Sequence, residues 1–205
     1  MSKKLLIIIP CFFLSIIILS SDGEAIVQEK KSGTITGTIK VRGVRDARDV
    51  IIFIEHIEGT YQPPQEIPVI DQKNLVFVPH VLPILVESNV QFPNSDEVRH
   101  NVFSPSKIKP FNLGTYSKGV TREVLFDKVG VVTLLCNVHT EMSAFIIVLE
   151  NPYFTKTGPD GTFTINDVPE GEYIIKTWHE KLKEKSLKVI LKEGKTVEAN
   201  FNLRR

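Results

Sequence analysis

Cysteine and methionine are scarce in this sequence, with two of each among 205 residues. Cys11 and Met1 belong to an apolar N-terminal stretch, so a chain without that stretch keeps only Cys136 and Met142. Such a chain has no intramolecular disulfide, although an oxidising compartment would permit one. A lone thiol in that compartment is reactive unless it is buried or bound to a metal. The sequence therefore requires a protected environment for Cys136.

Charge imbalance and the common catalytic motifs are also missing. The 25 basic and 24 acidic residues leave a net charge of +1, which predicts no nucleic-acid partner. We find no Gly-rich phosphate loop, Gly-x-Ser-x-Gly elbow or His-Glu-x-x-His zinc helix. Five histidines are too few for the trinuclear cluster of multicopper oxidases. We therefore expect a protein that is not an enzyme.

The N-terminus has the pattern of a secretory signal. Lys3 and Lys4 precede an apolar run over residues 5–19, and Gly23-Glu24-Ala25 offers small residues for cleavage. The run is about 15 residues and contains Pro10, whereas a bilayer span needs roughly 20. We predict a signal peptide over residues 1–25, a periplasmic or secreted protein, and no membrane insertion after its removal. A retained membrane anchor is the alternative.

The remaining chain predicts an all-β fold. In residues 33–41, Ile35, Ile39 and Val41 alternate with polar residues, and no segment keeps a helical period. Residues 181–186 form either a polar turn or a short helical stub. Further strands are expected at residues 50–54, 75–78, 81–92, 100–103, 123–126, 131–136, 145–149, 162–165, 173–178, 187–191 and 197–203. Short strands separated by Gly, Pro, Asn and Asp are typical of sandwiches and barrels.

Two Pro-containing breaks divide the chain. Residues 61–65 (Tyr-Gln-Pro-Pro-Gln) and Asn151-Pro152 enclose about 85 residues, a size that suits one small β-sandwich. The flanks together resemble a carboxypeptidase-regulatory-like (transthyretin-like, Cna-B-like) sandwich. That resemblance lies in the Gly-x-Ile-x-Gly-x-Ile pattern at 33–39, Asp-Gly-x-Phe-x-Ile at 160–165 and Val-Pro-x-Gly-x-Tyr at 168–173.

Two domain arrangements follow from these breaks. In the favoured one, a domain of residues 66–150 is inserted into a discontinuous sandwich made of residues 32–60 and 151–205. In the alternative, two domains follow one another and the first strands belong to the central fold. The sole tryptophan, Trp178, is expected in the core of the regulatory-like sandwich.

A metal-ligand pattern lies near the end of the central segment. Cys136, His139 and Met142 follow a Cys-x2-His-x2-Met spacing, which a tight loop between two strands can present. A third strong ligand must come from a distant strand, and His100 at the head of a β-type run fits that need. Two imidazoles, one thiolate and a weak axial thioether suit the Cu(I)/Cu(II) couple. The set therefore predicts one type 1 copper ion.

Residues 74–150 resemble a cupredoxin of the plastocyanin/amicyanin group, a Greek-key sandwich. The resemblance covers Phe77-Val78-Pro79, the strand pattern of residues 82–94, the His100-Asn101-Val102 motif and the short ligand loop. It implies that His100, Cys136 and His139 are equatorial ligands, that Met142 is axial, and that Asn101 ties the His100 strand to the Cys136 loop. The whole fold is then a cupredoxin sandwich combined with a smaller Ig/transthyretin-like sandwich.

The favoured function is single-electron transfer between redox partner proteins of the cell envelope, with His139 as the exposed edge. Copper capture, delivery or sensing is the alternative. Thr140 and Glu141 replace the Pro and apolar residues usual in the ligand loop, so the docking surface is not purely apolar. His80 is an ordinary surface histidine, part of a second metal site, or a residue that helps to close the first.

Overall fold

The computed structural model describes residues 17–19, 25–27 and 32–205 of the chain. Apart from β1 (Ile17–Leu19) and Ala25, the predicted signal peptide lies outside the described residues. Strand β1 pairs antiparallel with β2 (Ala25–Val27). Within the described ranges, no helix is long and apolar enough to cross a membrane.

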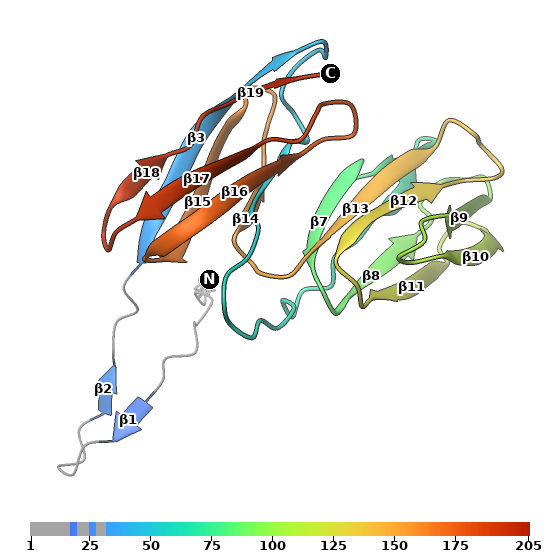
Figure 1. The fold of residues 1–205 in the computed structure, drawn as a ribbon. Coiled ribbons are helices and arrows are strands. Elements are labelled where there is room, and N and C mark those ends of the chain that lie inside the picture. The colour runs from blue at the N-terminus through green and yellow to red at the C-terminus, as the bar shows by residue number, and fades with distance from the viewer. Residues whose placement is uncertain (1–16, 20–24, 28–31) are drawn as a thin grey trace, which may run out of the picture.

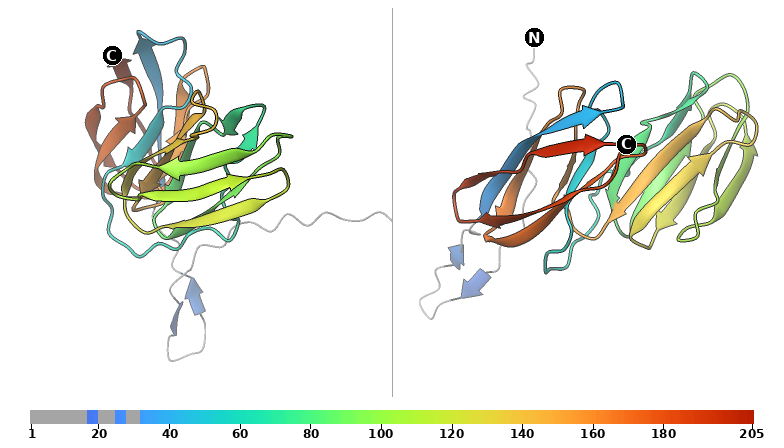
Figure 2. Two further views of the ribbon diagram at one scale, coloured as in Figure 1. Left: turned by 90° about the vertical axis from the view of Figure 1, so that its right-hand side faces the viewer. Right: turned by 45° about the horizontal axis from the view of Figure 1, so that its top comes forward.

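The fold is all-β, as predicted, and consists of two β-sandwiches that lie side by side (Figures 1 and 2). We call the first the terminal sandwich, because its strands come from the two ends of the described chain. The second, the central sandwich, uses the strands between them. Each sandwich has its own apolar core, and a third small apolar cluster lies where they meet.

The terminal sandwich packs two sheets face to face. One sheet has the order β14-β4-β16-β17, and in the other β3 pairs with β15, β18 and β19. The strands are β3 (Ser32–Arg42), β4 (Ile51–Ile54), β14 (Phe154–Lys156), β15 (Thr162–Pro169), β16 (Gly171–Trp178), β17 (Ser186–Leu191), β18 (Thr196–Glu198) and β19 (Phe201–Arg204). Strands far apart in sequence are therefore neighbours, since β3 pairs with β15 and β4 with β16.

Two glycines explain the sequence pattern at the start of β3. A Cβ on Gly33 would lie 2.6 Å from the Lys195 carbonyl oxygen, and one on Gly37 would lie 2.1 Å from the Ala199 carbonyl oxygen. The residues between them alternate, with Ile35 fully buried. Glycine at these two positions lets the backbone after β17 cross closely over β3.

The central sandwich holds a five-stranded sheet of order β10-β9-β12-β13-β7, which packs over the strand pair β11-β8. A hairpin of β5 and β6 lies beside β8. The strands are β5 (Asp71–Lys73), β6 (Val76–Val78), β7 (Val81–Leu85), β8 (Ser88–Pro93), β9 (His100–Ser104), β10 (Phe111–Tyr116), β11 (Thr121–Phe126), β12 (Gly130–Leu135) and β13 (Ser143–Leu149).

Several strand limits differ from the sequence prediction. The single strand expected over residues 81–92 is two strands, because Glu87 takes a positive φ of 68° and turns the chain between β7 and β8. Residues 197–203 likewise divide into β18 and β19. Strands β5, β10 and β14 were not expected. Residues 181–186 form no helix, and the chain there makes a turn between β16 and β17.

The two sandwiches meet through an apolar cluster on β7 and β13 of one and β4, β14 and β16 of the other. Its buried members are Ile51, Val81, Ile147, Leu149 and Trp178. The ring centroids of Trp178 and Phe145 are 5.4 Å apart. The prediction that Trp178 belongs to the core of the regulatory-like sandwich was wrong: the side chain belongs to the cluster between the sandwiches, where its ring contacts Phe145 of the central sandwich.

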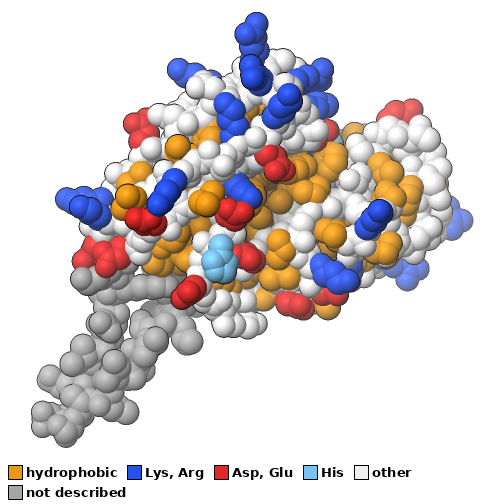
Figure 3. All heavy atoms as spheres, in the orientation of Figure 1, with side chains coloured by type: hydrophobic (Ala, Val, Ile, Leu, Met, Phe, Trp, Pro, Cys, Tyr) orange, Lys and Arg blue, Asp and Glu red, His pale blue; other side chains and the backbone are white. Residues whose placement is uncertain are grey.

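Lys and Arg side chains gather over one end of the terminal sandwich, the end at which β3 and β19 finish (Figure 3). Elsewhere on this face, basic, acidic and apolar side chains are interspersed. The chain as a whole is almost neutral, so the basic gathering is a local feature of the fold.

Candidate metal centre

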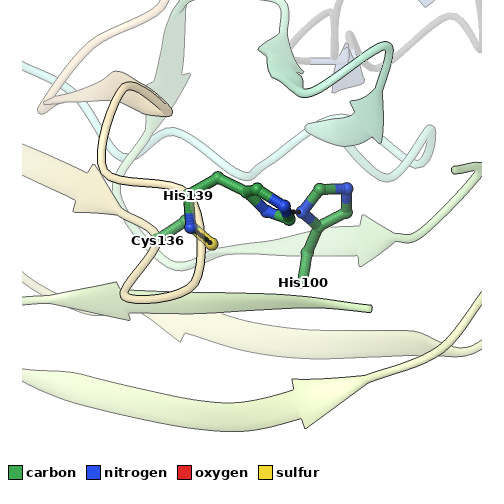
Figure 4. Close-up of side chains that lie close together, drawn as sticks. All are labelled: His100, Cys136 and His139. Carbon is green, nitrogen blue, oxygen red and sulfur yellow. Dashed lines mark hydrogen bonds between the residues drawn. The ribbon is translucent and has the colours of Figure 1, made fainter. Parts of the chain in front are cut away.

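Three metal-ligating side chains converge at one end of the central sandwich. Nitrogen atoms of His100 and His139 and the sulfur of Cys136 all lie within 4.8 Å of one another. His100 opens β9, Cys136 directly follows β12, and His139 lies in the loop that leads into β13 (Figure 4). The distant strand thus supplies the ligand that the short loop lacks.

The two imidazoles face each other through the same ring atom. The Nδ1 atoms of His100 and His139 are 3.0 Å apart, and the ring centroids are 4.8 Å apart. On the far side of the His100 ring, Nε2 lies 2.7 Å from Oδ2 of Asp96. A carboxylate can only accept, so Nε2 donates its proton to Asp96, and a neutral His100 then has its lone pair on Nδ1, which faces Nδ1 of His139.

Asp96 is itself firmly held. Burial raises the pKa of this carboxyl, but hydrogen bonds from the Leu75 N–H, from His100 and from the Asn74 N–H outweigh it, so the pKa lies below its usual value. Asn74 and Leu75 form the turn of the β5–β6 hairpin, both with positive φ. The hairpin turn therefore fixes the carboxylate that orients His100.

The Cys136 sulfur is enclosed and surrounded by N–H donors. The side chain is 3% exposed, and its Sγ lies 3.5 Å from the backbone nitrogens of Asn101 and His139. Two backbone N–H groups are therefore directed at the sulfur. Burial also protects this thiol, which meets the requirement set by the sequence.

The ligand loop is closed by its own backbone. The Cys136 N–H donates to the Met142 carbonyl at 3.3 Å, and the Met142 N–H donates to the His139 carbonyl at 3.1 Å. The Met142 side chain is 1% exposed and packs in the same apolar cluster as Cys136. The loop thus turns the Met142 side chain into the apolar core instead of toward solvent.

Asn101 joins the two segments that carry the ligands. Its Oδ1 accepts a hydrogen bond at 3.4 Å from the N–H of Asn137, the residue that follows Cys136 in the chain. Its Nδ2 donates to Asn112 Oδ1 and to the Gly114 carbonyl, at 2.8 and 3.0 Å. The Asn101 residue is 1% exposed, whereas its three partners belong to exposed residues, so the bonds are partly buried. The predicted tie between the His100 strand and the Cys136 loop is confirmed.

The two histidines differ in their access to solvent. His100 is fully buried, whereas His139 is partly exposed and is flanked by the exposed Val138. Glu141 in the same loop is also exposed. The His139 ring is therefore the part of the site that another molecule can reach.

No protein-family model and no curated protein matches this chain. The solved structures similar to it are cupredoxins. A purple cupredoxin from Nitrosopumilus maritimus is 25% identical, with a TM-score of 0.37, over 40% of this chain and 98% of its own. A reduced amicyanin variant is 18% identical, with a TM-score of 0.39, over 42% of this chain and 91% of its own. A Cu(I) amicyanin variant is 17% identical, with a TM-score of 0.39, over 49% of this chain and 98% of its own. The predicted resemblance of the terminal sandwich to the carboxypeptidase-regulatory-like family stays a prediction.

The fold brings together three of the four predicted ligands, His100, Cys136 and His139, and buries Met142 in the apolar cluster that contains Cys136. Sequence reasoning missed Asp96. Asp96 lies four residues before His100, a spacing that predicts side-chain contact only in a helix. Here a bend before β9 brings the carboxylate of Asp96 to the His100 ring instead.

His80 lies next to the ligand loop without belonging to a metal-ligand group of three in the described residues. Its Nδ1 donates to the Ser143 carbonyl at 3.0 Å, and its Nε2 lies 3.4 Å from Glu180 of the terminal sandwich. The other histidines are remote: His56 pairs with Glu150, and His179 Nδ1 accepts from the Lys181 N–H.

Proposed function

We propose that the protein binds one copper ion through His100, Cys136, His139 and Met142 and transfers single electrons between redox partners. The observation that carries this proposal is the convergence of two imidazole Nδ1 atoms on a buried cysteine sulfur, which two N–H groups surround. The protein is on this account a carrier and not an enzyme.

The donor set fits copper better than other ions. A thiolate and two imidazoles are soft or borderline donors, which disfavours Mg²⁺ and Ca²⁺. The buried thioether of Met142, packed with Cys136, is a weak ligand that copper tolerates and that adds little for Zn²⁺. Copper bound to this set would supply a one-electron couple.

The surrounding residues keep the ligands in place. Asp96 fixes the His100 tautomer, Asn101 ties the two ligand segments, and the loop is closed at Cys136 and Met142 by its own backbone. A ligand set that does not rearrange favours rapid electron exchange, because both oxidation states share one geometry. The partly exposed His139 is the proposed contact for the partner.

We also propose that residues 66–150 form the copper domain, inserted into a sandwich of residues 32–60 and 151–205, in an exported protein whose partners are redox proteins of the cell envelope. The pairing of β3 with β15, β18 and β19 supports the insertion, as does the separate core of the central sandwich. Residues 66–150 expressed alone should fold and bind copper, and failure would contradict the insertion.

The decisive experiment is to load the protein with Cu(II) and record its visible and EPR spectra. The wild type should show an intense thiolate-to-copper band, and Cys136→Ser should lose it. His56→Gln, which alters an exposed histidine of the terminal sandwich, is the matched control and should keep the band. A wild-type protein without the band, or a band that survives Cys136→Ser, would contradict the proposal.

Voltammetry separates electron transfer from copper delivery. A carrier should show a reversible couple and keep its metal through many cycles. A delivery protein should surrender Cu(I) readily to a competing chelator, and that result would replace electron transfer by the alternative function.

A further inference from the structure

Six basic side chains lie together at one end of the terminal sandwich. All six are exposed. They come from the end of β3 and the loop after it, from the β16–β17 turn, and from the end of β19. We call this cluster the basic end; its members are Lys40, Arg42, Arg45, Lys183, Arg204 and Arg205. Figure 3 shows basic side chains gathered there.

Backbone pairing and a hydrogen bond hold these three segments side by side. Arg204 is opposite Arg42 in the parallel pairing of β19 with β3, and Lys183 donates its backbone N–H to the Arg204 carbonyl at 2.8 Å. A Cβ on Gly43 would lie 3.5 Å from the side chain of Arg205. No two of these segments are adjacent in sequence, so the cluster exists only in the folded chain.

The acidic neighbour of the basic end is held mainly by another residue: hydrogen bonds from Arg48 are the main cause of the lowered pKa of Asp46, and the charge of Arg45 contributes less. None of the six side chains of the basic end forms an ion pair with an acidic residue in the described part of the chain. The nearby Asp46 carboxylate is already paired with Arg48 at 2.8 Å. Holding like charges close together destabilises a fold slightly, and the field they create attracts an anionic partner.

The basic end and the candidate metal centre lie at the same end of the molecule. Ser143, which directly follows Met142, accepts a hydrogen bond from His80, and His80 faces Glu180 at 3.4 Å. Glu180 lies in the same β16–β17 turn as Lys183, which contacts Arg204. A short series of contacts therefore leads from the ligand loop to the basic end.

The relative position of the two surfaces is fixed by the junction between the sandwiches. Trp178 and Phe145 are in ring contact there, and Lys156 of β14 donates to the Val81 carbonyl of β7 at 2.8 Å. A rigid junction lets one partner contact both sandwiches at once. It also keeps the basic end of the terminal sandwich beside the candidate metal centre of the central sandwich.

We propose that the basic end and the exposed edge of His139 form one docking surface for an acidic redox protein. This rests on the proposed function, because the partner must carry a redox centre of its own to exchange electrons with the site. A lipid headgroup is anionic but carries none. The terminal sandwich then supplies electrostatic steering, and His139 supplies the electronic contact.

The test uses the full chain, with its copper, and one probe in two charge states. Native cytochrome c is basic, and the same protein with succinylated lysines is acidic. The variant is Arg42→Glu/Arg204→Glu. The control is Lys192→Glu/Lys195→Glu, which makes the same charge change at the other end of β3, where the carbonyls of both lysines lie near Gly33.

Association is measured at low ionic strength by calorimetry, and electron exchange by stopped flow. The wild type and the control should bind the succinylated probe, native cytochrome c should not bind, and the basic-end variant should bind about tenfold more weakly. About 0.2 M salt should remove most of the difference. Unchanged binding in the variant, or equal losses in variant and control, would overturn the proposal.

Two further measurements separate a failure of the docking proposal from a failure of the proposed function. Binding does not require copper, so a protein that lacks the visible band but discriminates the two probes contradicts the proposed function and supports the basic end as a protein-binding surface. Vesicles of phosphatidylglycerol and phosphatidylcholine test the lipid alternative. If the wild type binds these vesicles more tightly than the succinylated probe, and the variant loses that binding, the acidic-protein assignment is overturned.

Discussion

His100 presents Nδ1 to the candidate metal site because Nε2, the other nitrogen of its ring, is hydrogen-bonded to Asp96. The Nε2–Oδ2 distance is 2.7 Å, His100 is fully buried, and the carboxylate is held in turn by two backbone N–H groups. The tautomer and the orientation of the ring are therefore set before a metal arrives.

Replacing Asp96 by Ala should lower copper affinity about 10- to 100-fold, because the ring loses its fixed tautomer. The measurement is a Cu(I) competition titration against a chromophoric chelator. Glu97→Ala is the matched control, since the neighbouring Glu97 is exposed and pairs only with Lys118. An affinity that is the same in both variants would show that Asp96 does not position His100.

Replacing Asn101 by Ala should lower the free energy of unfolding of the metal-free protein by about 1–3 kcal/mol, because the three hydrogen bonds of a buried side chain are lost. Urea unfolding followed by circular dichroism gives the value. Asn89→Ala, at an exposed position of β8, should change it by less than about 0.5 kcal/mol. The Asn101 variant should also release copper faster. Release at the wild-type rate would limit Asn101 to a structural role.

Replacing Met142 by Leu should leave copper bound and raise the reduction potential, because the axial thioether adds little binding energy but tunes the couple. Voltammetry of the loaded variant measures the shift. A potential that falls, or loss of the metal at neutral pH, would show that Met142 is not the axial ligand.

Replacing Trp178 by Ala should cost about 3–5 kcal/mol of folding free energy, because a large buried ring is lost from the junction of the sandwiches. Thermal and urea unfolding measure the cost. The visible copper band should persist, since the tryptophan lies in a different apolar cluster from Cys136 and Met142. Ile190→Ala, at a site that is 57% exposed, is the control and should be close to neutral. A small cost at Trp178 would mean that the junction contributes little.

The convergence of His100, Cys136 and His139 could be predicted from the sequence because of the chemistry of metal ligands. A lone cysteine with a histidine three residues later needs further ligands, and only a few histidines were available. The all-β class followed in the same way from alternation, which β3 shows directly in its burial. Patterns that repeat along one segment are visible in a sequence.

Features made by distant segments were not predictable. Asp96 reaches His100 through a bend that no local pattern indicates, and Glu87 divides an apolar run by its backbone conformation alone. Trp178 was assigned to the wrong apolar cluster. An apolar residue on β16 can pack inside its own sandwich or against the other one, and the sequence does not distinguish the two. The basic end combines segments separated by more than a hundred residues, so a balanced overall charge concealed it.

The pairing of β4 with β14 has a consequence for the order of assembly. Phe53 lies opposite Phe154, so the two strands are direct neighbours although the whole central sandwich separates them in the chain. During synthesis, β3 and β4 emerge long before their partners, whereas β5 to β13 find all their ladder partners within their own segment. Closing so long a loop delays pairing. The central sandwich is thus free to fold first, and the early strands stay unpaired until the last quarter of the chain has been made.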